Sequence, residues 1–180
     1  MKPMIEEMYR RFGDAVYTIN EQETLEENLV ALLKEKGMTL STAESCTGGL
    51  IGASVTDIPG ASEVYLGGIV SYSNDAKENI LGVAHDTLSE NGAVSEQTAR
   101  QMAEGAVRVF GSDYSVAVTG IAGPGGATET KPVGLVYISV ADGPRTVVTR
   151  NVFKGDRQAV RESTVREACS LLIDMVEGRL

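Results

Sequence analysis

Short apolar runs with the character of β-strands alternate with helix-like segments along most of this chain, and the alternation ends in two adjacent strand-like runs. Such alternation is typical of a layered domain in which helices cover both faces of a largely parallel sheet. The final pair, joined by "DGPR", predicts an antiparallel hairpin. We therefore expect an α/β fold: a layered α/β/α domain with a mixed, mostly parallel sheet. The predicted strands span residues 38–43, 63–73, 113–120, 135–141 and 146–153.

Capping residues mark the ends of the predicted helices. Thr24, followed three residues later by Glu27, forms a capping box, and Gly37 closes that helix. Ser95 begins a longer helix that Gly111 ends. The remaining predicted helices span residues 47–57, roughly residues 75–81 with Ser73 or Asn74 as the cap, and the segment after Asp156.

Composition narrows the class of protein. With 180 residues the chain fits one domain that can bury a sizeable core. The net charge of −9 argues against a nucleic-acid binder, which needs clustered Lys and Arg. No secretory h-region and no apolar run of membrane-spanning length is present. Cys46 and Cys169 lie far apart, which fits a protein of the reducing cytoplasm without a disulfide framework.

The single histidine limits the possible chemistry. His85 lies in "GVAHDTLSENG", which we interpret as a polar connecting segment. A Ser-His-Asp triad would have to use it, and sites with several histidines are excluded. No Cys-x-x-Cys pair is present either. We therefore expect chemistry without a metal ion.

Three loops follow predicted strands and carry unusual residues: 43–49, 71–77 and 119–132. Ligands of α/β sheets gather at the carboxyl ends of strands, where such loops converge. The third loop is too rich in glycine to be an ordinary connection, but it lacks the Gly-Lys-Ser/Thr ending of a phosphate-binding P-loop. These loops are the candidate site.

Ser45 lies in "STAESCTGG", between a predicted strand and a predicted helix. Unpaired N–H groups at a helix N-terminus favour negative charge, so this geometry suits an oxyanion hole or a phosphate seat. Gly48 and Gly49 would let a ligand approach the main chain closely. The alternative is that Ser45 or Thr47 only caps the helix. Cys46 is a rival nucleophile, but no histidine is placed to activate it.

Lys77 and Tyr72 stand out in "SYSNDAK". A lysine in the first turn of a helix opposes the helix dipole, and such exceptions often lie at functional sites. Burial would lower the pKa of Lys77 and make its neutral amine available as a base. The alternative is a surface lysine beside a half-buried tyrosine. In "FKGDRQAVR", Lys154, Arg157 and Arg161 start a helix that either binds an anion or is simply solvated.

Six ordered blocks, "TAESCTGG", "SYSNDAK", "GAVSEQTA", "VTGIAGPGG", "KPVGLVYI" and "GDR", resemble the CinA C-terminal domain family over roughly residues 24–176. The resemblance implies a nicotinamide-nucleotide amidase, which converts nicotinamide mononucleotide to nicotinate mononucleotide and ammonia without a metal ion or a cofactor. It also implies that Ser45 is the nucleophile, with Lys77 as its partner and Tyr72 nearby. The predicted substrate-binding residues are Cys46, Thr47, Gly48, Gly49, Asn74, Thr119, Gly120, Gly123 and Arg157.

In the mechanism we expect, Ser45 attacks the carboxamide and neutral Lys77 takes its proton. Backbone N–H groups of residues 45–49 hold the oxyanion, and Lys77, or Tyr72 as a relay, protonates the leaving ammonia. The phosphate binds near Arg157 or the glycine-rich loops. Two alternatives are a nucleotide-binding module without catalysis and a regulatory domain of a longer protein.

The resemblance divides the chain into two parts. Residues 1–21 resemble the tail of a preceding domain, with a short helix and a short strand, and residues 22–180 form the amidase-like domain. The chain is either a stand-alone amidase or a fragment of a longer protein. We expect a cytoplasmic protein that binds a small nucleotide substrate, neither nucleic acid nor membrane, and family habit favours a homodimer.

Overall fold

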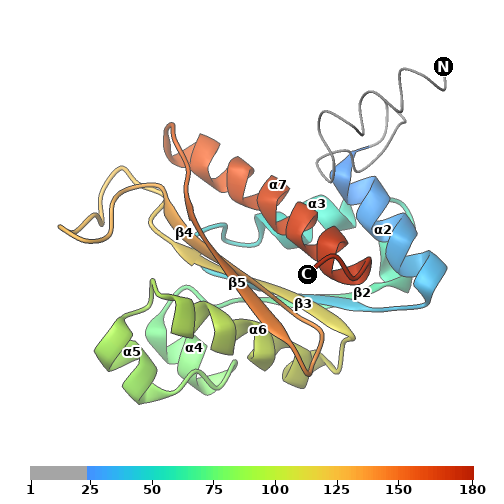
Figure 1. Cartoon of the computed structure of the whole chain (residues 1–180), viewed down its shortest axis with the longest axis horizontal. Helices are drawn as coiled ribbons and strands as arrows, with labels where there is room; N and C mark the ends of the chain where they lie inside the picture. Colours follow the sequence, from blue (N-terminus) through green and yellow to red (C-terminus); the bar gives the residue numbers. More distant parts are fainter. Residues whose placement is uncertain (1–23) are drawn as a thin grey trace.

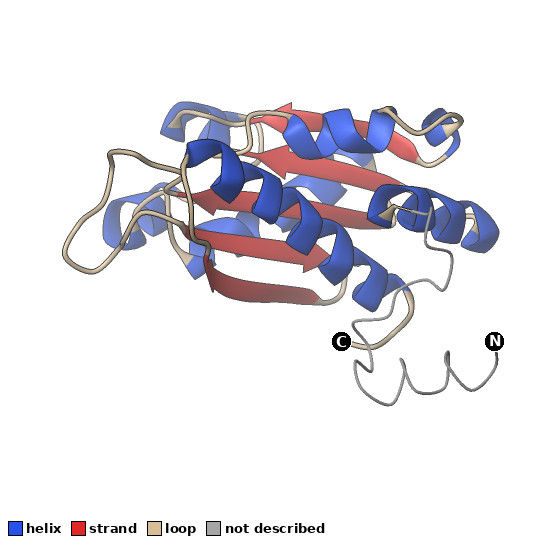
Figure 2. Ribbon diagram, turned by 90° about the horizontal axis from the view of Figure 1, so that it is seen from above, coloured by secondary structure: helices blue, strands red, loops and turns tan. Residues whose placement is uncertain are grey.

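The computed structural model describes residues 24–180, so the helix and strand predicted within residues 1–21 lie outside the described part. The protein is a five-stranded sheet between two layers of helices (Figures 1 and 2). The strands are β1 (Leu40–Glu44), β2 (Tyr65–Val70), β3 (Tyr114–Gly120), β4 (Leu135–Ala141) and β5 (Thr146–Val152). The helices are α2 (Leu25–Lys36), α3 (Leu50–Thr56), the short 3-10 helix η2 (Ala61–Glu63), α4 (Asn74–Asn79), α5 (His85–Asn91), α6 (Glu96–Phe110) and α7 (Arg157–Val176).

The sheet has the strand order β2-β1-β3-β4-β5. Strand β1 is parallel to both β2 and β3, whereas β4 is antiparallel to β3 and to β5. The α/β/α layers and the mixed sheet confirm the predicted fold class. The arrangement brings the carboxyl ends of β1, β2 and β3 to the same edge of the sheet, where the three candidate loops begin.

Alternate residues of the strands face two different cores. Helices α2, α3 and α7 cover one face, which holds the larger core around Leu40, Val118 and Leu172 (Figure 1). Helices α4, α5 and α6 cover the other face, where the strands present small side chains such as Ala43 and Ala117. Small residues at the contact let helix and sheet backbones approach closely, so α6 lies near the sheet.

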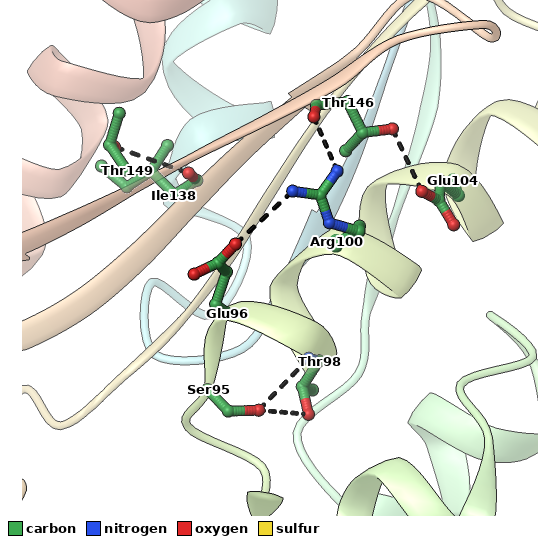
Figure 3. Close-up of polar contacts among 8 residues, drawn as sticks. All are labelled: Ser95, Glu96, Thr98, Arg100, Glu104, Ile138, Thr146 and Thr149. Carbon is green, nitrogen blue, oxygen red and sulfur yellow. Dashed lines mark hydrogen bonds and ion pairs between the residues drawn. The ribbon is translucent and has the colours of Figure 1, made fainter.

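Helix α6 is also tied to the edge strand β5 by polar contacts (Figure 3). Arg100 Nη1 donates to the Thr146 carbonyl at 2.7 Å, and Thr146 Oγ1 donates to Glu104 at 3.2 Å. At the start of the helix, the Ser95 hydroxyl accepts from the Thr98 N–H. These bonds hold α6 across the sheet and fix the loop that precedes it.

Most predicted caps are confirmed. Thr24 and Glu27 form the capping box of α2, Gly37 ends that helix in the left-handed region, and Asp156 caps α7. Ser95 and Gly111 bound α6 as predicted. Of the two candidates for α4, Ser73 is the cap.

Several predicted elements differ from the structure, and three of the differences bear on the candidate loops or on His85. Helix α3 begins at Leu50 and not at residue 47, because Gly48 and Gly49 both adopt positive φ and form a turn. Strand β2 ends at Val70, so residues 71–73 belong to the loop. The supposed polar connection around His85 is the short helix α5, which buries Leu88 against the smaller core.

Candidate active site

The candidate site begins where β1 leaves the sheet. The Ser45 N–H still donates to the Val118 carbonyl of β3 at 3.1 Å, and the Ser71 N–H donates to the Glu44 carbonyl at 2.8 Å. The chain then forms a tight turn over residues 45–49, which we call the Ser45 turn. Neighbouring strands on both sides thus fix the backbone that enters it.

Lys77 lies against Ser45. The Lys77 side chain is 1% exposed, and its Nζ lies 3.2 Å from Ser45 Oγ. The same Nζ donates to the Ser71 carbonyl at 2.6 Å. Burial lowers the pKa of Lys77, because the charged amine loses its hydration. The structure therefore brings the predicted nucleophile and the predicted base together.

Lys77 is not an exception to the helix-dipole rule. Helix α4 has only six residues, and Lys77 belongs to its last turn, where a positive charge suits the dipole. What distinguishes Lys77 from a surface lysine is its burial. The cap at Ser73 and the short helix direct the side chain back towards β1.

Tyr72 does not reach the pair. Its side chain is 65% exposed, and its hydroxyl accepts from Arg157 Nη2 at 3.2 Å. Within residues 24–180 it makes no hydrogen bond to Lys77 or Ser45. The structure therefore does not support Tyr72 as a proton relay; it places Tyr72 beside the predicted anion-binding arginine.

The N-terminus of α3 is already occupied, which corrects the predicted anion seat. The Glu44 side chain is 1% exposed and turns onto the start of the helix. It accepts hydrogen bonds from the N–H groups of Gly49, Ile51 and Gly52, and from the Thr47 hydroxyl. These amides are not available to a ligand. Neither Ser45 nor Thr47 is the cap: Gly49 holds that position without a side-chain bond.

Two N–H groups of the Ser45 turn face the Cys46 thiol and not an oxygen of the described residues. The Gly48 N–H donates to the Ser45 carbonyl, whereas those of Cys46 and Thr47 donate to no oxygen of the described residues. They lie near the Cys46 thiol, whose pKa burial raises to about 11. Cys46 is therefore a thiol at neutral pH, which argues against it as the nucleophile. The amides of Cys46 and Thr47 are the candidate oxyanion donors of this turn.

Helix α7 connects the Ser45 turn with the glycine-rich loop. Arg157 Nη1 donates to the Gly123 carbonyl at 3.1 Å, and Arg161 Nη2 donates to the Thr47 carbonyl at 2.6 Å. Both arginines line a shallow pocket of about 310 Å³ beside Leu50. Glu162 lines the same pocket, so two guanidinium groups face one carboxylate there.

Three of the other predicted binding residues have packing or loop contacts within the protein, and the fourth is exposed. The buried Thr119 hydroxyl donates to the Ala93 carbonyl, so it holds the loop before α6 in place. A Cβ at Gly120 would lie 2.6 Å from the Leu135 carbonyl, so its small size is needed for packing against β4. Gly123 similarly leaves room for Val133. Asn74 is exposed at the start of α4.

The sequence did not reveal three contacts of the site: those of Glu44 with the Ser45 turn, of Ser71 with Lys77, and of Arg161 with Thr47. Glu44 is the only charged residue of a strand that is otherwise small or apolar, and that was the available signal. Ser71 acts through its carbonyl, which no side-chain pattern reveals. Its buried hydroxyl has no hydrogen-bond partner among the described residues.

No group of three or more His, Cys, Asp or Glu side chains within residues 24–180 is arranged to hold a metal ion. None of the helices described here is both long and apolar enough to cross a membrane.

Comparisons with known proteins agree with this architecture. A CinA-like protein of Thermotoga sp. (strain RQ2) is 43% identical over 176 residues, which cover 98% of this chain and 43% of that protein. The chain thus spans less than half the length of this relative. Among solved structures, the competence/damage inducible protein CihA from Agrobacterium tumefaciens superposes with a TM-score of 0.82 at 43% identity, covering 85% of this chain and 93% of that one.

A CinA superfamily protein from Escherichia coli superposes with a TM-score of 0.79 at 32% identity, over 87% of this chain and 93% of that one. The model of the CinA C-terminal domain matches residues 22–176, which include every element of the described fold. This chain belongs to the CinA C-terminal domain family.

Proposed function

We propose that this domain is an amidohydrolase that releases ammonia from the carboxamide of nicotinamide mononucleotide. The observation that carries the proposal is the contact between a buried lysine of lowered pKa and a serine hydroxyl, 3.2 Å apart. Lysine can serve as a general base only when its amine is neutral, and burial favours that form. The choice of substrate comes from the family resemblance.

In the first step Ser45 Oγ attacks the carboxamide carbon, and its proton passes to the neutral amine of Lys77. The Ser71 carbonyl, which accepts from Nζ at 2.6 Å, orients the amine so that its lone pair can face Ser45. The amides of Cys46 and Thr47 stabilise the oxyanion of the tetrahedral intermediate. The carbon–oxygen bond forms in this step.

In the second step the carbon–nitrogen bond breaks, and the proton held by Lys77 passes to the leaving nitrogen. Ammonia departs and leaves an ester of Ser45 with the pyridine carboxyl group. Water then attacks the ester, with Lys77 again as base. This returns the Ser45 hydroxyl and releases nicotinate mononucleotide.

The nucleotide's phosphate is the second recognition element. Arg157 is exposed at the start of α7 and already contacts both Tyr72 and the glycine-rich loop. Its guanidinium can pair with phosphate oxygens in a bidentate geometry. These contacts support Arg157 as the residue that holds the phosphate, with Tyr72 beside it.

The test is ammonia release from nicotinamide mononucleotide by the purified protein, measured with EDTA present and beside Ser45→Ala. We expect turnover in the wild type and none in the variant. The substitution keeps Glu44 and Thr47, whose side chains are bonded to each other across the turn. Release of ammonia at the same rate by both proteins would contradict Ser45 as nucleophile.

A second outcome would identify the non-catalytic alternative. If neither protein releases ammonia while the nucleotide raises the melting temperature of both, the domain is a nucleotide-binding module. If the nucleotide also fails to raise the melting temperature, the regulatory-domain alternative is favoured.

A further inference from the structure

We propose that Glu44 is a positioning residue for the nucleophile: its carboxylate holds the Ser45 turn in the conformation in which Ser45 meets Lys77. Glu44 lies immediately before Ser45 and is fully buried. A buried carboxylate is costly unless hydrogen bonds compensate for its lost hydration. The arrangement of those bonds shows what the carboxylate does.

Four donors converge on the two carboxylate oxygens. Oε2 accepts from the Thr47 hydroxyl at 2.6 Å, the Gly49 N–H at 2.9 Å and the Ile51 N–H at 3.1 Å. Oε1 accepts from the Gly52 N–H at 2.8 Å. The donors lie on both sides of Gly48, so the carboxylate closes the Ser45 turn across its base.

The backbone of Glu44 is fixed at the same time by the sheet. It pairs with Val70 of β2 and Val118 of β3, and its carbonyl accepts from the Ser71 N–H. The carbonyl of that same Ser71 accepts from Lys77 Nζ. Glu44 therefore connects both partners: its side chain orders the turn that carries Ser45, and its carbonyl orders the residue that anchors Lys77.

The Glu44 carboxylate also occupies the N-terminal amides of α3, so these amides do not bind a ligand. Without it, the free amides of Gly49, Ile51 and Gly52 would attract an anion beside the nucleophile. With it, the N–H groups close to Ser45 that donate to no oxygen of the described residues are those of Cys46 and Thr47, which lie at the Cys46 thiol.

Glu44→Gln tests this role with little change in volume. A glutamine offers one acceptor oxygen where the carboxylate offers two, so its amide nitrogen must face a donor. The matched control is Tyr65→Phe, which removes the 2.7 Å hydrogen bond between Tyr65 and Thr42. Thr42, Glu44 and Tyr65 line the same crevice between β2 and α3. Both variants lose polar contacts at this crevice, but only Glu44→Gln changes a contact of the Ser45 turn.

This inference rests on Ser45 as the proposed nucleophile, so the measurement follows Ser45 directly. A fluorophosphonate probe forms a bond between Ser45 Oγ and phosphorus, with loss of fluoride and transfer of the serine proton to Lys77. Mass spectrometry gives the rate of labelling at Ser45. We expect Glu44→Gln to react about 10- to 100-fold more slowly than Tyr65→Phe, because small misplacements of reacting groups cost rates of this size.

The melting temperature separates positioning from general stability. A smaller slowing of the labelling is expected for Thr47→Val, which removes one of the four hydrogen bonds and keeps the carboxylate.

Equal labelling rates of Glu44→Gln and Tyr65→Phe at similar melting temperatures would overturn the proposal. So would a wild-type Ser45 that labels no faster than other serines. Fast labelling of the wild type without ammonia release would instead refute the proposed substrate and leave the role of Glu44 intact.

Discussion

The amine of Lys77 is buried without a carboxylate partner. Its nearest polar contacts are the Ser45 hydroxyl and the Ser71 carbonyl, and the ion pairs found within residues 24–180 do not include it. Two uncharged oxygens offset only part of the hydration that an ammonium group loses on burial. The burial that would favour Lys77 as the proposed base should therefore reduce the stability of the folded protein while Lys77 is charged.

Lys77→Met should show this reduction as a dependence on pH. The pKa of Lys77 is lower in the folded than in the unfolded chain, so between the two values only the unfolded chain carries the proton. Wild-type stability must rise with pH across that interval, whereas methionine at the same position has no proton to lose. We expect the stability of Lys77→Met relative to wild type to fall as pH is raised from about 6 to about 10. Chemical denaturation at a series of pH values measures it, and a difference independent of pH would contradict the lowered pKa.

Tyr72→Phe distinguishes a binding role from a relay. The Tyr72 hydroxyl accepts from Arg157 and does not reach Lys77, so its loss should weaken substrate binding and not proton transfer. A lost hydrogen bond of about 1 kcal/mol corresponds to roughly a fivefold rise in KM, with kcat nearly unchanged. Steady-state ammonia release gives both constants. A large fall in kcat at constant KM would restore Tyr72 as a relay.

At the scale of elements, the crevice between β2 and α3 restricts which residues helix α3 can carry. Gly52 lies inside α3, where alanine would favour the helix by about 1 kcal/mol. A Cβ at this position would lie 2.6 Å from the Tyr65 hydroxyl and 3.5 Å from Glu44 Oε1. The glycine is therefore required by a neighbouring side chain and not by its own backbone conformation.

The effect of Gly52→Ala on stability should therefore depend on whether residue 65 is tyrosine or phenylalanine. In the wild type we expect it to destabilise the protein by about 1–3 kcal/mol, because the Tyr65 hydroxyl must move. In the Tyr65→Phe background the obstructing atom is gone, and the same change should be neutral or mildly stabilising. Denaturant unfolding of the four proteins completes the cycle. Equal costs in both backgrounds would show that Tyr65 is not the obstacle.

The predictability of each element followed the range of its interactions. The caps at Thr24, Ser95 and Asp156 bond residues three positions away, and they were predicted correctly. The pairing of Ser45 with Lys77 required the family resemblance and the rule that strand ends converge. The role of Glu44 could not be predicted, because the pattern around it equally fits an open anion seat. Only the direction of its side chain decides between the two.

At the scale of the whole molecule, the candidate site joins four segments that are distant in sequence. The Ser45 turn, the start of α4, the glycine-rich loop and the start of α7 meet at one edge of the sheet. Arg157 and Arg161 provide the contacts between α7 and two of the other segments. A nucleotide bound there would contact several of these segments at once, so its binding should stabilise the entire fold.

Thermal unfolding of Ser45→Ala with and without ligand measures this stabilisation without turnover. At a ligand concentration of 100 times Kd, binding adds about 2.7 kcal/mol, which corresponds to roughly 5–10 °C for a domain of this size. We expect nicotinamide mononucleotide to raise the melting temperature more than nicotinamide riboside, which lacks the phosphate. Adding Arg157→Gln should reduce the response to the nucleotide and leave that to the riboside nearly unchanged, because only the phosphate needs the guanidinium. A loss of both responses would instead show that Arg157 mainly holds Gly123 and Tyr72 in place. The riboside has no phosphate, so its response would change only if the shape of the site changed.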